Sequence, residues 1–223
     1  MARVTLRKGL QTVAIALLLQ FGWVIPAAAQ AGDSGTVAAV ADLDGSGSRP
    51  ISLSGSPLDF GPVSRPNGAS PGAICEWDMA VDGPGTTLIL RHIAQGSSTW
   101  IEGYPNPSNC QHLGTYSSAK FEVSCDPLND VTFMLSYANG GVTGVTLMPS
   151  RGVRMSYVNR GATNGGLAGT VFDTMTVPCP NGSTGSIVPG ELDLYVGGRL
   201  QIDSDAATGT DIVVGTLTVT AMY

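Results

Sequence analysis

The chain has 223 residues, with 11 Lys and Arg against 17 Asp and Glu, so its formal net charge is −6. Hydrophobic residues make up 43% of the chain, which excludes an intrinsically disordered protein. The acidic balance argues against nucleic acid as a partner, because binding phosphate needs a basic surface. With 30 Gly, 14 Pro and only 13% charged residues, the composition disfavours helices and favours an all-β protein.

Residues 1–29 have the three parts of a secretory signal peptide: a basic start over 3–8, an apolar stretch over 13–25, and small residues before an expected cleavage after Ala29. A membrane anchor is the weaker interpretation, because polar and glycine residues interrupt a stretch that is already short for a span. We therefore expect an exported protein, located in the periplasm, at the cell surface or outside the cell. We expect no membrane span in the mature chain.

Residues 30–48 leave two interpretations open. The segment is rich in Gly, Ser and Ala, which is typical of a flexible leader. It also contains one weakly alternating stretch, Thr36–Leu43, which would serve as a donor strand for this sandwich or for a neighbour's.

Residues 49–223 are predicted to form a single β-sandwich domain. Short runs with a period of two alternate with Gly and Asn turns, a pattern that predicts an antiparallel sandwich or barrel and no amphipathic helix. The expected strands are 51–53, 58–61, 75–81, 88–93, 119–125, 131–137, 142–147, 153–158, 174–177, 192–196, 200–202 and 217–223.

The four cysteines are Cys75, Cys110, Cys125 and Cys179. In an exported protein they predict two disulfides, and their spacing contains no CxxC pair that would indicate zinc or redox chemistry. The strand phase turns Cys125 and Cys179 inward, which favours one bridge between them and a second between Cys75 and Cys110. Sequence alone permits three pairings.

No constellation of residues indicates catalysis, a cofactor or a metal. Gly32–Gly35 copies a protease nucleophile motif, but nothing precedes it that would supply the partner His and Asp. Residues 42–47, DLDGSG, begin like a calcium-binding loop. The twelfth position of that loop is Leu53, where a calcium loop has a Glu ligand. His92 and His112, the only two imidazoles, are interpreted as structural. We therefore expect no enzyme.

Two aromatic side chains, Trp100 and Tyr104, are the candidate ligand contacts. They lie in the loop-rich segment 95–115, where an exposed aromatic pair can stack on a sugar ring. The other interpretation is that they cover the edge of the sandwich. Trp77, by contrast, has the strand phase of a core residue.

Several short segments keep the order seen in a known family. They are PISL at 50–53 followed by LDFG at 58–61, AKFEVS at 119–124 followed by DVTF at 130–133, and LYVGGRL at 194–200 followed by GTLTVTAMY at 215–223. Over residues 50–223 the chain resembles the bacterial exported family catalogued as domain of unknown function 4402, similar in style to spore-coat-U-like and pilin-like sandwiches. It departs from that family between Cys75 and Cys110, and at Cys125, where the family often has Gly. The resemblance implies an immunoglobulin-like sandwich at the cell surface and brings no catalytic residues.

The leading functional hypothesis is an exported structural or assembly protein, either a pilin-like subunit or a secreted matrix component. Its partners would be identical or related subunits, joined by strand addition, and a periplasmic chaperone. The acceptor would be the last strand, in which Leu217, Val219, Ala221 and Tyr223 share one face. The alternative is a surface adhesin or glycan-binding module that uses the 95–115 loop.

Overall fold

The computed structural model describes residues 34–43, 51–66, 72–94, 97–103, 109–127, 129–160, 168–181 and 189–223, and for 34–43 it describes the backbone only. In these residues the protein is all-β, with fifteen strands and no helix, as the composition and the alternation predicted. The strands are β1 (Ser34–Leu43), β2 (Ser52–Ser56), β3 (Leu58–Pro62), β4 (Ile74–Asp82), β5 (Gly85–Ile93), β6 (Ile101–Glu102), β7 (Ala119–Cys125), β8 (Asp130–Asn139), β9 (Val145–Met148), β10 (Met155–Asn159), β11 (Ala168–Thr170), β12 (Thr174–Pro178), β13 (Gly190–Val196), β14 (Gly198–Asp203) and β15 (Ile212–Met222).

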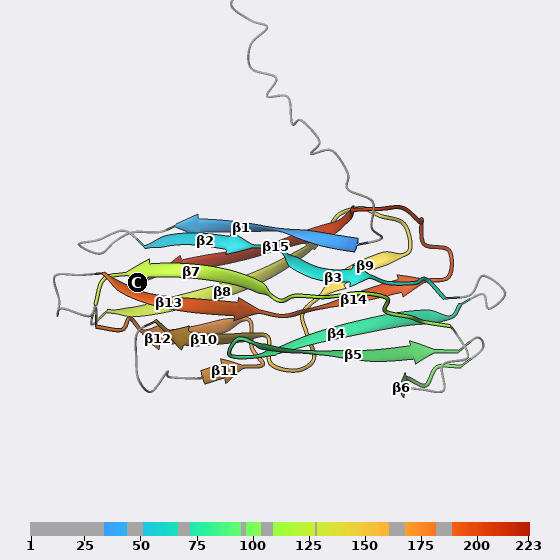
Figure 1. Ribbon diagram of the computed structural model, residues 1–223, viewed down its shortest axis with the longest axis horizontal. Helices are drawn as coiled ribbons and strands as arrows, with labels where there is room; N and C mark the ends of the chain where they lie inside the picture. The colour runs from blue at the N-terminus through green and yellow to red at the C-terminus, as the bar shows by residue number, and fades with distance from the viewer. Residues whose placement is uncertain are drawn as a thin grey trace, which may run out of the picture.

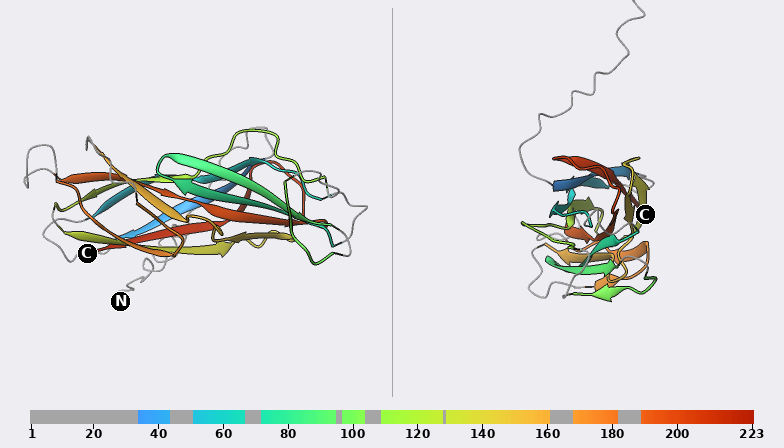
Figure 2. Two further views of the ribbon diagram at one scale, coloured as in Figure 1. Left: turned by 90° about the horizontal axis from the view of Figure 1, so that it is seen from below. Right: turned by 90° about the vertical axis from the view of Figure 1, so that its right-hand side faces the viewer.

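The strands form three five-stranded sheets in a sandwich-like fold. The first sheet has the order β12-β8-β15-β1-β3, the second β11-β10-β13-β7-β2, and the third β6-β5-β4-β14-β9. The second and third sheets lie end to end along an elongated molecule, with β13 continuing into β14 (Figure 1), and the end-on view shows a narrow cross-section (Figure 2). The pairs are antiparallel except that β1 runs parallel to β15. The immunoglobulin-like arrangement stays a prediction.

The core follows from the alternation of apolar and polar residues. In β7, Ala119, Phe121, Val123 and Cys125 are buried while the residues between them are partly or fully exposed. The largest fully buried side chains come from all three sheets, and each contributes about 1.5–3 kcal/mol through burial. They include Trp77, Phe60, Phe121, Phe133, Leu192, Leu200 and Leu217, so the prediction that Trp77 belongs to the core is confirmed.

Gly197 is the residue at which one continuous segment leaves the second sheet and enters the third. A Cβ atom at this position would clash with the carbonyl oxygen of Met79, so a larger residue does not fit. The Gly197 N–H donates to the carbonyl of Arg154 at 2.9 Å, and its own carbonyl accepts a hydrogen bond from the Tyr137 hydroxyl at 2.7 Å. Tyr137 belongs to β8 of the first sheet, and burial raises the pKa of its hydroxyl. All three sheets therefore meet at this glycine.

The structure has the disulfide pairing that the strand phase favoured. Cys125 at the end of β7 is bonded to Cys179 just after β12, with a Cα–Cα distance of 6.0 Å, so this bridge joins the second sheet to the first. Cys75 in β4 is bonded to Cys110 with a Cα–Cα distance of 5.6 Å. This bridge joins the segment after β6 to the third sheet. Two disulfides are compatible with an oxidising, exported environment.

Two short strands were not predicted. β6 has two residues and lies inside the segment interpreted as loop, and β11 has three. Both are edge strands, held in place by a neighbouring strand. Runs of this length are too short to display a period of two, so alternation gives no signal for them.

Replacing both Cys125 and Cys179 by alanine is expected to lower the free energy of unfolding by about 2–5 kcal/mol, because the bridge restricts the unfolded chain and joins two sheets. Denaturant titration measures the change. The matched control, Cys75→Ala with Cys110→Ala, opens a shorter loop of 35 rather than 54 residues and is expected to cost slightly less. Free thiols at Cys125 and Cys179 in protein purified under oxidising conditions, found by mass spectrometry, would contradict this prediction.

Candidate functional site

The first candidate site is the position of β1 in the first sheet. β1 pairs in parallel with β15 over nine positions, from Gly35 opposite Ile212 to Leu43 opposite Ala221. On its other side it pairs antiparallel with β3. We call the edges of β15 and β3 that pair with β1 the β1 seat. Residues 34–43 of the segment 30–48 form β1, paired within their own chain; the rest of that segment lies outside the described residues.

The β1 seat depends on β1 to complete the first sheet. Without β1, the N–H and C=O groups on one side of β15 would lose their ladder partners, and β3 would lose the strand that joins it to this sheet. The inward side chains of β15 next to the seat are fully buried: Leu217, Val219 and Ala221. An empty seat is therefore an open strand edge beside an apolar core, which is a template for pairing with another chain.

The second candidate site lies around Trp100 on the outer side of the third sheet. Glu76 of β4 is fully buried there, and the Arg151 guanidinium donates two hydrogen bonds of 3.0 and 3.1 Å to its carboxylate. Arg199 of β14 lies 3.5 Å from the same carboxylate, and burial lowers the pKa of this arginine while Glu76 opposes the shift. The guanidinium of Arg151 in turn lies over the ring of Trp100, 5.4 Å from its centroid.

Asp78 completes this arginine–carboxylate cluster of Glu76, Asp78, Arg151 and Arg199. The residue is 2% exposed, and its carboxylate accepts a 2.6 Å hydrogen bond from the Ser150 hydroxyl and further bonds from the Arg151 backbone N–H. The cluster therefore holds the segment after β9 against the outer side of the third sheet. Each of the two buried acids faces a charged or hydrogen-bonding partner. Its role is structural.

Sequence reasoning missed this cluster. Glu76 and Asp78 alternate with the core residues of β4, a phase that by itself indicates the side of the strand facing away from the core. Their burial depends on residues about 75 positions away in the chain. Trp100, which sequence reasoning did single out, is half-buried and has one ring face occupied by Arg151. Tyr104 lies outside the described residues, so the predicted aromatic pair is represented here by Trp100 alone.

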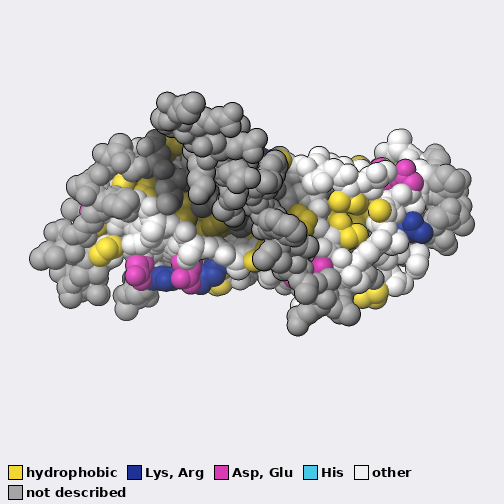
Figure 3. All heavy atoms as spheres, turned by 90° about the horizontal axis from the view of Figure 1, so that it is seen from above, with side chains coloured by type: hydrophobic (Ala, Val, Ile, Leu, Met, Phe, Trp, Pro, Cys, Tyr) yellow, Lys and Arg dark blue, Asp and Glu magenta, His cyan; other side chains and the backbone are white. Residues whose placement is uncertain are grey.

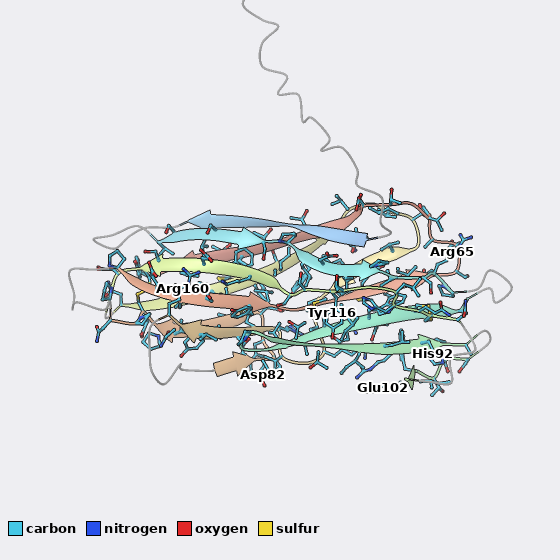
Figure 4. The ribbon with its side chains drawn as sticks, in the orientation of Figure 1. Arg65, Asp82, His92, Glu102, Tyr116 and Arg160 are labelled. Atoms are coloured by element: carbon cyan, nitrogen blue, oxygen red, sulfur yellow. A yellow bond between two sulfur atoms is a disulfide. The ribbon has the colours of Figure 1, made fainter. Side chains whose placement is uncertain are left out.

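The second sheet has a contrasting outer surface of charges that are partly or fully exposed. Lys120 lies 3.1 Å from Asp193 and 3.3 Å from Glu122, and Arg160 lies 2.6 Å from Glu122. The hydrogen bond from Arg160 lowers the pKa of the Glu122 carboxyl. Figure 3 shows acidic and basic side chains alternating on this half of the molecule, and Figure 4 labels Arg160 there. Exposed pairs of this kind contribute about 0–1 kcal/mol each.

A cavity of about 270 Å³ opens beside the start of β15. Its apolar wall includes Val145, Leu200 and Val214, and Arg65 is the one cation among its described lining residues. The Arg65 guanidinium donates to the carbonyl of Ala206 at 3.1 Å. Figure 4 labels Arg65 at the end of the molecule that also holds His92. The cavity is large enough for a small apolar group.

Neither a metal centre nor a helical membrane span occurs in the part of the chain that the structure describes. No three His, Cys, Asp or Glu side chains come together there as a metal site requires. No described helix is long and apolar enough to cross a membrane. Comparison with family models, with curated proteins and with solved structures found no match to this chain.

Arg151→Ala is expected to lower the free energy of unfolding by about 3 kcal/mol, because it leaves a fully buried carboxylate at Glu76 without its bidentate partner. The loss stays at the low end because Arg199 still faces Glu76. The matched control is Arg160→Ala, which breaks exposed pairs and is expected to cost under about 1 kcal/mol. Equal losses for the two variants in denaturant titration would show that the cluster is no more stabilising than surface pairs.

The burial of His92 predicts that the free energy of unfolding falls in mild acid. Its side chain is buried in β5, and among the described residues neither ring nitrogen has a hydrogen-bond partner. Burial lowers the pKa of His92 below its ordinary value of 6.5, because the folded protein disfavours the charged imidazole. The contribution of neutral His92 to the free energy of unfolding is therefore fully present above pH 6.5 and is lost as the pH falls. Unfolding measured between pH 7 and pH 5 is expected to show stability falling by up to about 1.4 kcal/mol per pH unit. In His92→Leu this part of the slope disappears, whatever the variant's absolute stability; an unchanged slope would contradict the prediction.

Proposed function

We propose that the protein is an exported structural subunit of the cell surface, a pilin-like subunit or a secreted matrix component, that joins identical or related subunits by exchanging β1. The observation that carries the proposal is the pairing of β1 with β15, the first and last strands of the described chain. A strand that completes a sheet from one end of the chain can complete the same sheet of a neighbour with the same contacts.

The energetics support exchange rather than simple addition. Every ladder hydrogen bond that β1 makes to β15 and β3 is recovered when a neighbour's β1 takes the same place, so exchange costs little at equilibrium. The segment 44–50 that follows β1 has the sequence DGSGSRP, whose Gly and Ser are typical of a flexible linker. A linker of seven residues can bridge at most about 23–25 Å, which sets the upper limit on the reach of an exchanged β1.

A periplasmic chaperone belongs to the same proposal. The β1 seat has an unpaired edge whenever β1 is absent, and an exposed edge is an aggregation hazard. A chaperone strand that fills the seat during export removes the hazard until a subunit's β1 replaces it. The adhesin alternative has less support, because among the described residues it has Trp100 alone, with one ring face on Arg151.

A cysteine pair across β1 and β15 tests the exchange. Ala38 is opposite Thr216, and neighbouring strands lie about 4.8 Å apart, within the Cα distances of disulfides. In Ala38→Cys with Thr216→Cys, an exchanged β1 links different chains, so a non-reducing gel of concentrated protein is expected to show a ladder. Dilute, freshly folded protein is expected to give a cross-linked monomer.

Each single-cysteine variant is the matched control and can form no species larger than a covalent dimer. Monomer alone at every concentration for the double variant would overturn the exchange. Deleting residues 30–48 provides a second measurement, since loss of β1 is expected to lower solubility and stability. A truncated chain that stays monomeric, soluble and as stable as the full chain would show that this segment donates nothing.

A further inference from the structure

The turn between β11 and β12 presents an exposed phenylalanine. Phe172 is 70% exposed, the highest value among the large exposed apolar side chains of the described residues, and Val171 before it is 47% exposed. We call these two side chains the knob. A single exposed apolar residue is common on protein surfaces, so the knob points to a partner only through how it is held and what it matches.

The backbone that carries the knob is fixed by three hydrogen bonds. The Phe172 N–H donates to the Thr170 hydroxyl at 3.1 Å, and the Leu135 N–H donates to the carbonyl of Asp173 at 2.8 Å. The Arg154 guanidinium donates to the Asp173 carboxylate at 2.7 Å. A turn held in this way has little conformational freedom left to lose on binding, which is a property of good interface anchors.

The cavity beside the start of β15 has the size and the lining to accept such a side chain. Its volume is about 270 Å³, whereas an apolar cavity of about 150 Å³ already binds benzene. A bulge in β15 between Val213 and Gly215 leaves Val214 without a partner in β1. The bulge reverses the alternation, so that Ile212 and Val214 line the cavity although they are out of phase with the buried Leu217.

The charges beside the knob and the cavity are opposite. Asp173 follows Phe172 directly, and its side chain stays 45% exposed although Arg154 pairs with it. Arg65 is exposed and is the one cation among the described lining residues of the cavity. An acid beside the knob and a guanidinium beside the cavity favour one orientation of approach between two copies that otherwise repel each other.

The knob and the cavity lie apart on the same chain. The turn after β11 is on the lower side of the molecule, whereas the loop from β14 to β15, whose residues 207–209 line the cavity, lies at the upper right (Figure 1). The knob therefore matches the cavity of another copy and not its own. A contact between two different places on identical chains does not pair them around a two-fold axis, and it builds rings or open filaments.

We propose that the knob of one copy inserts into the cavity of the next. The Phe172 ring enters the cavity, and Asp173 faces Arg65 at its rim. This contact goes beyond the exchange of β1 and does not rest on it, because the exchange uses the edges of β15 and β3. Repeated from copy to copy, it joins subunits head to tail.

A locked chain separates this contact from β1 exchange. Ala38→Cys with Thr216→Cys, oxidised in dilute solution, holds β1 in its own sheet, so every species in the experiment is unable to exchange it. Sedimentation of the full-length locked chain is then measured over a range of concentrations. We expect species that lengthen as the concentration rises, as a head-to-tail contact requires.

Two variants of the locked chain each remove one side of the contact. Phe172→Ser removes the knob, and Thr208→Trp fills the cavity from an exposed position in its lining. Each variant alone is expected to associate with a dissociation constant at least about tenfold higher than that of the locked chain. An equimolar mixture is expected to form a dimer and nothing larger, because the Phe172 variant keeps its cavity and the Thr208 variant keeps its knob.

Leu113→Ser is the matched control, since Leu113 is 69% exposed and lies away from both the knob and the cavity lining. It is expected to leave association unchanged. Ala207→Trp, at another exposed lining position, repeats the test if Thr208→Trp does not fold. A locked chain that stays monomeric up to about 1 mM would overturn the proposal. So would equal association of the Phe172 and Leu113 variants, or a mixture without a dimer.

The two proposals fail separately. A disulfide ladder in concentrated protein, together with a locked chain that stays monomeric, would overturn the knob contact alone. A locked chain that associates, with no ladder in concentrated protein, would support the knob contact and overturn the exchange.

Discussion

The crossing of the chain from the second sheet to the third at Gly197, between β13 and β14, determines the elongated shape of this molecule. Because the backbone there touches the carbonyl of Met79 and leaves no room for a Cβ, β13 and β14 follow each other closely and place their sheets end to end. The first sheet must then be long enough to cover both. β15 does so: Gly215 near its start packs on Leu147 of the third sheet, and Tyr223 just beyond its end hydrogen-bonds Asp126, next to the second sheet.

The three outer surfaces differ in how their polar groups are satisfied. The second sheet leaves its ion pairs in water, where each contributes little. The third sheet buries Glu76 and Asp78 almost completely, so loss of a partner would leave a buried charge without compensation. The first sheet has mainly Thr and Ser at the outward positions of β8, β12 and β15, where their hydroxyls are partly or fully exposed. One core thus supports three chemically distinct exteriors.

Alternation along the chain predicted most of this fold, and it failed where contacts come from far away. The phase of Phe121, Val123 and Cys125 predicted both a core strand and the bridge to Cys179. The same phase argument gives no sign that Glu76 is buried, since its partner Arg151 lies 75 residues further along the chain. Alternation in Thr36–Leu43 was enough to suggest a strand. It could not predict that the partner is β15 or that the two strands run parallel, because register depends on the assembled sheet.

The pairing of β1 with β15 also has a consequence for the time course of folding. Synthesis proceeds from the N-terminus, so among the described strands β1 is made first and its partner β15 last. The contact that closes the first sheet joins positions as distant as Gly35 and Ile212. Contacts of such high order form slowly, because loop closure must precede any gain from pairing. Until that contact forms, the first sheet lacks β1 and the edges of β15 and β3 stay open; under the proposed exchange, this is the interval in which the β1 of another subunit takes the place.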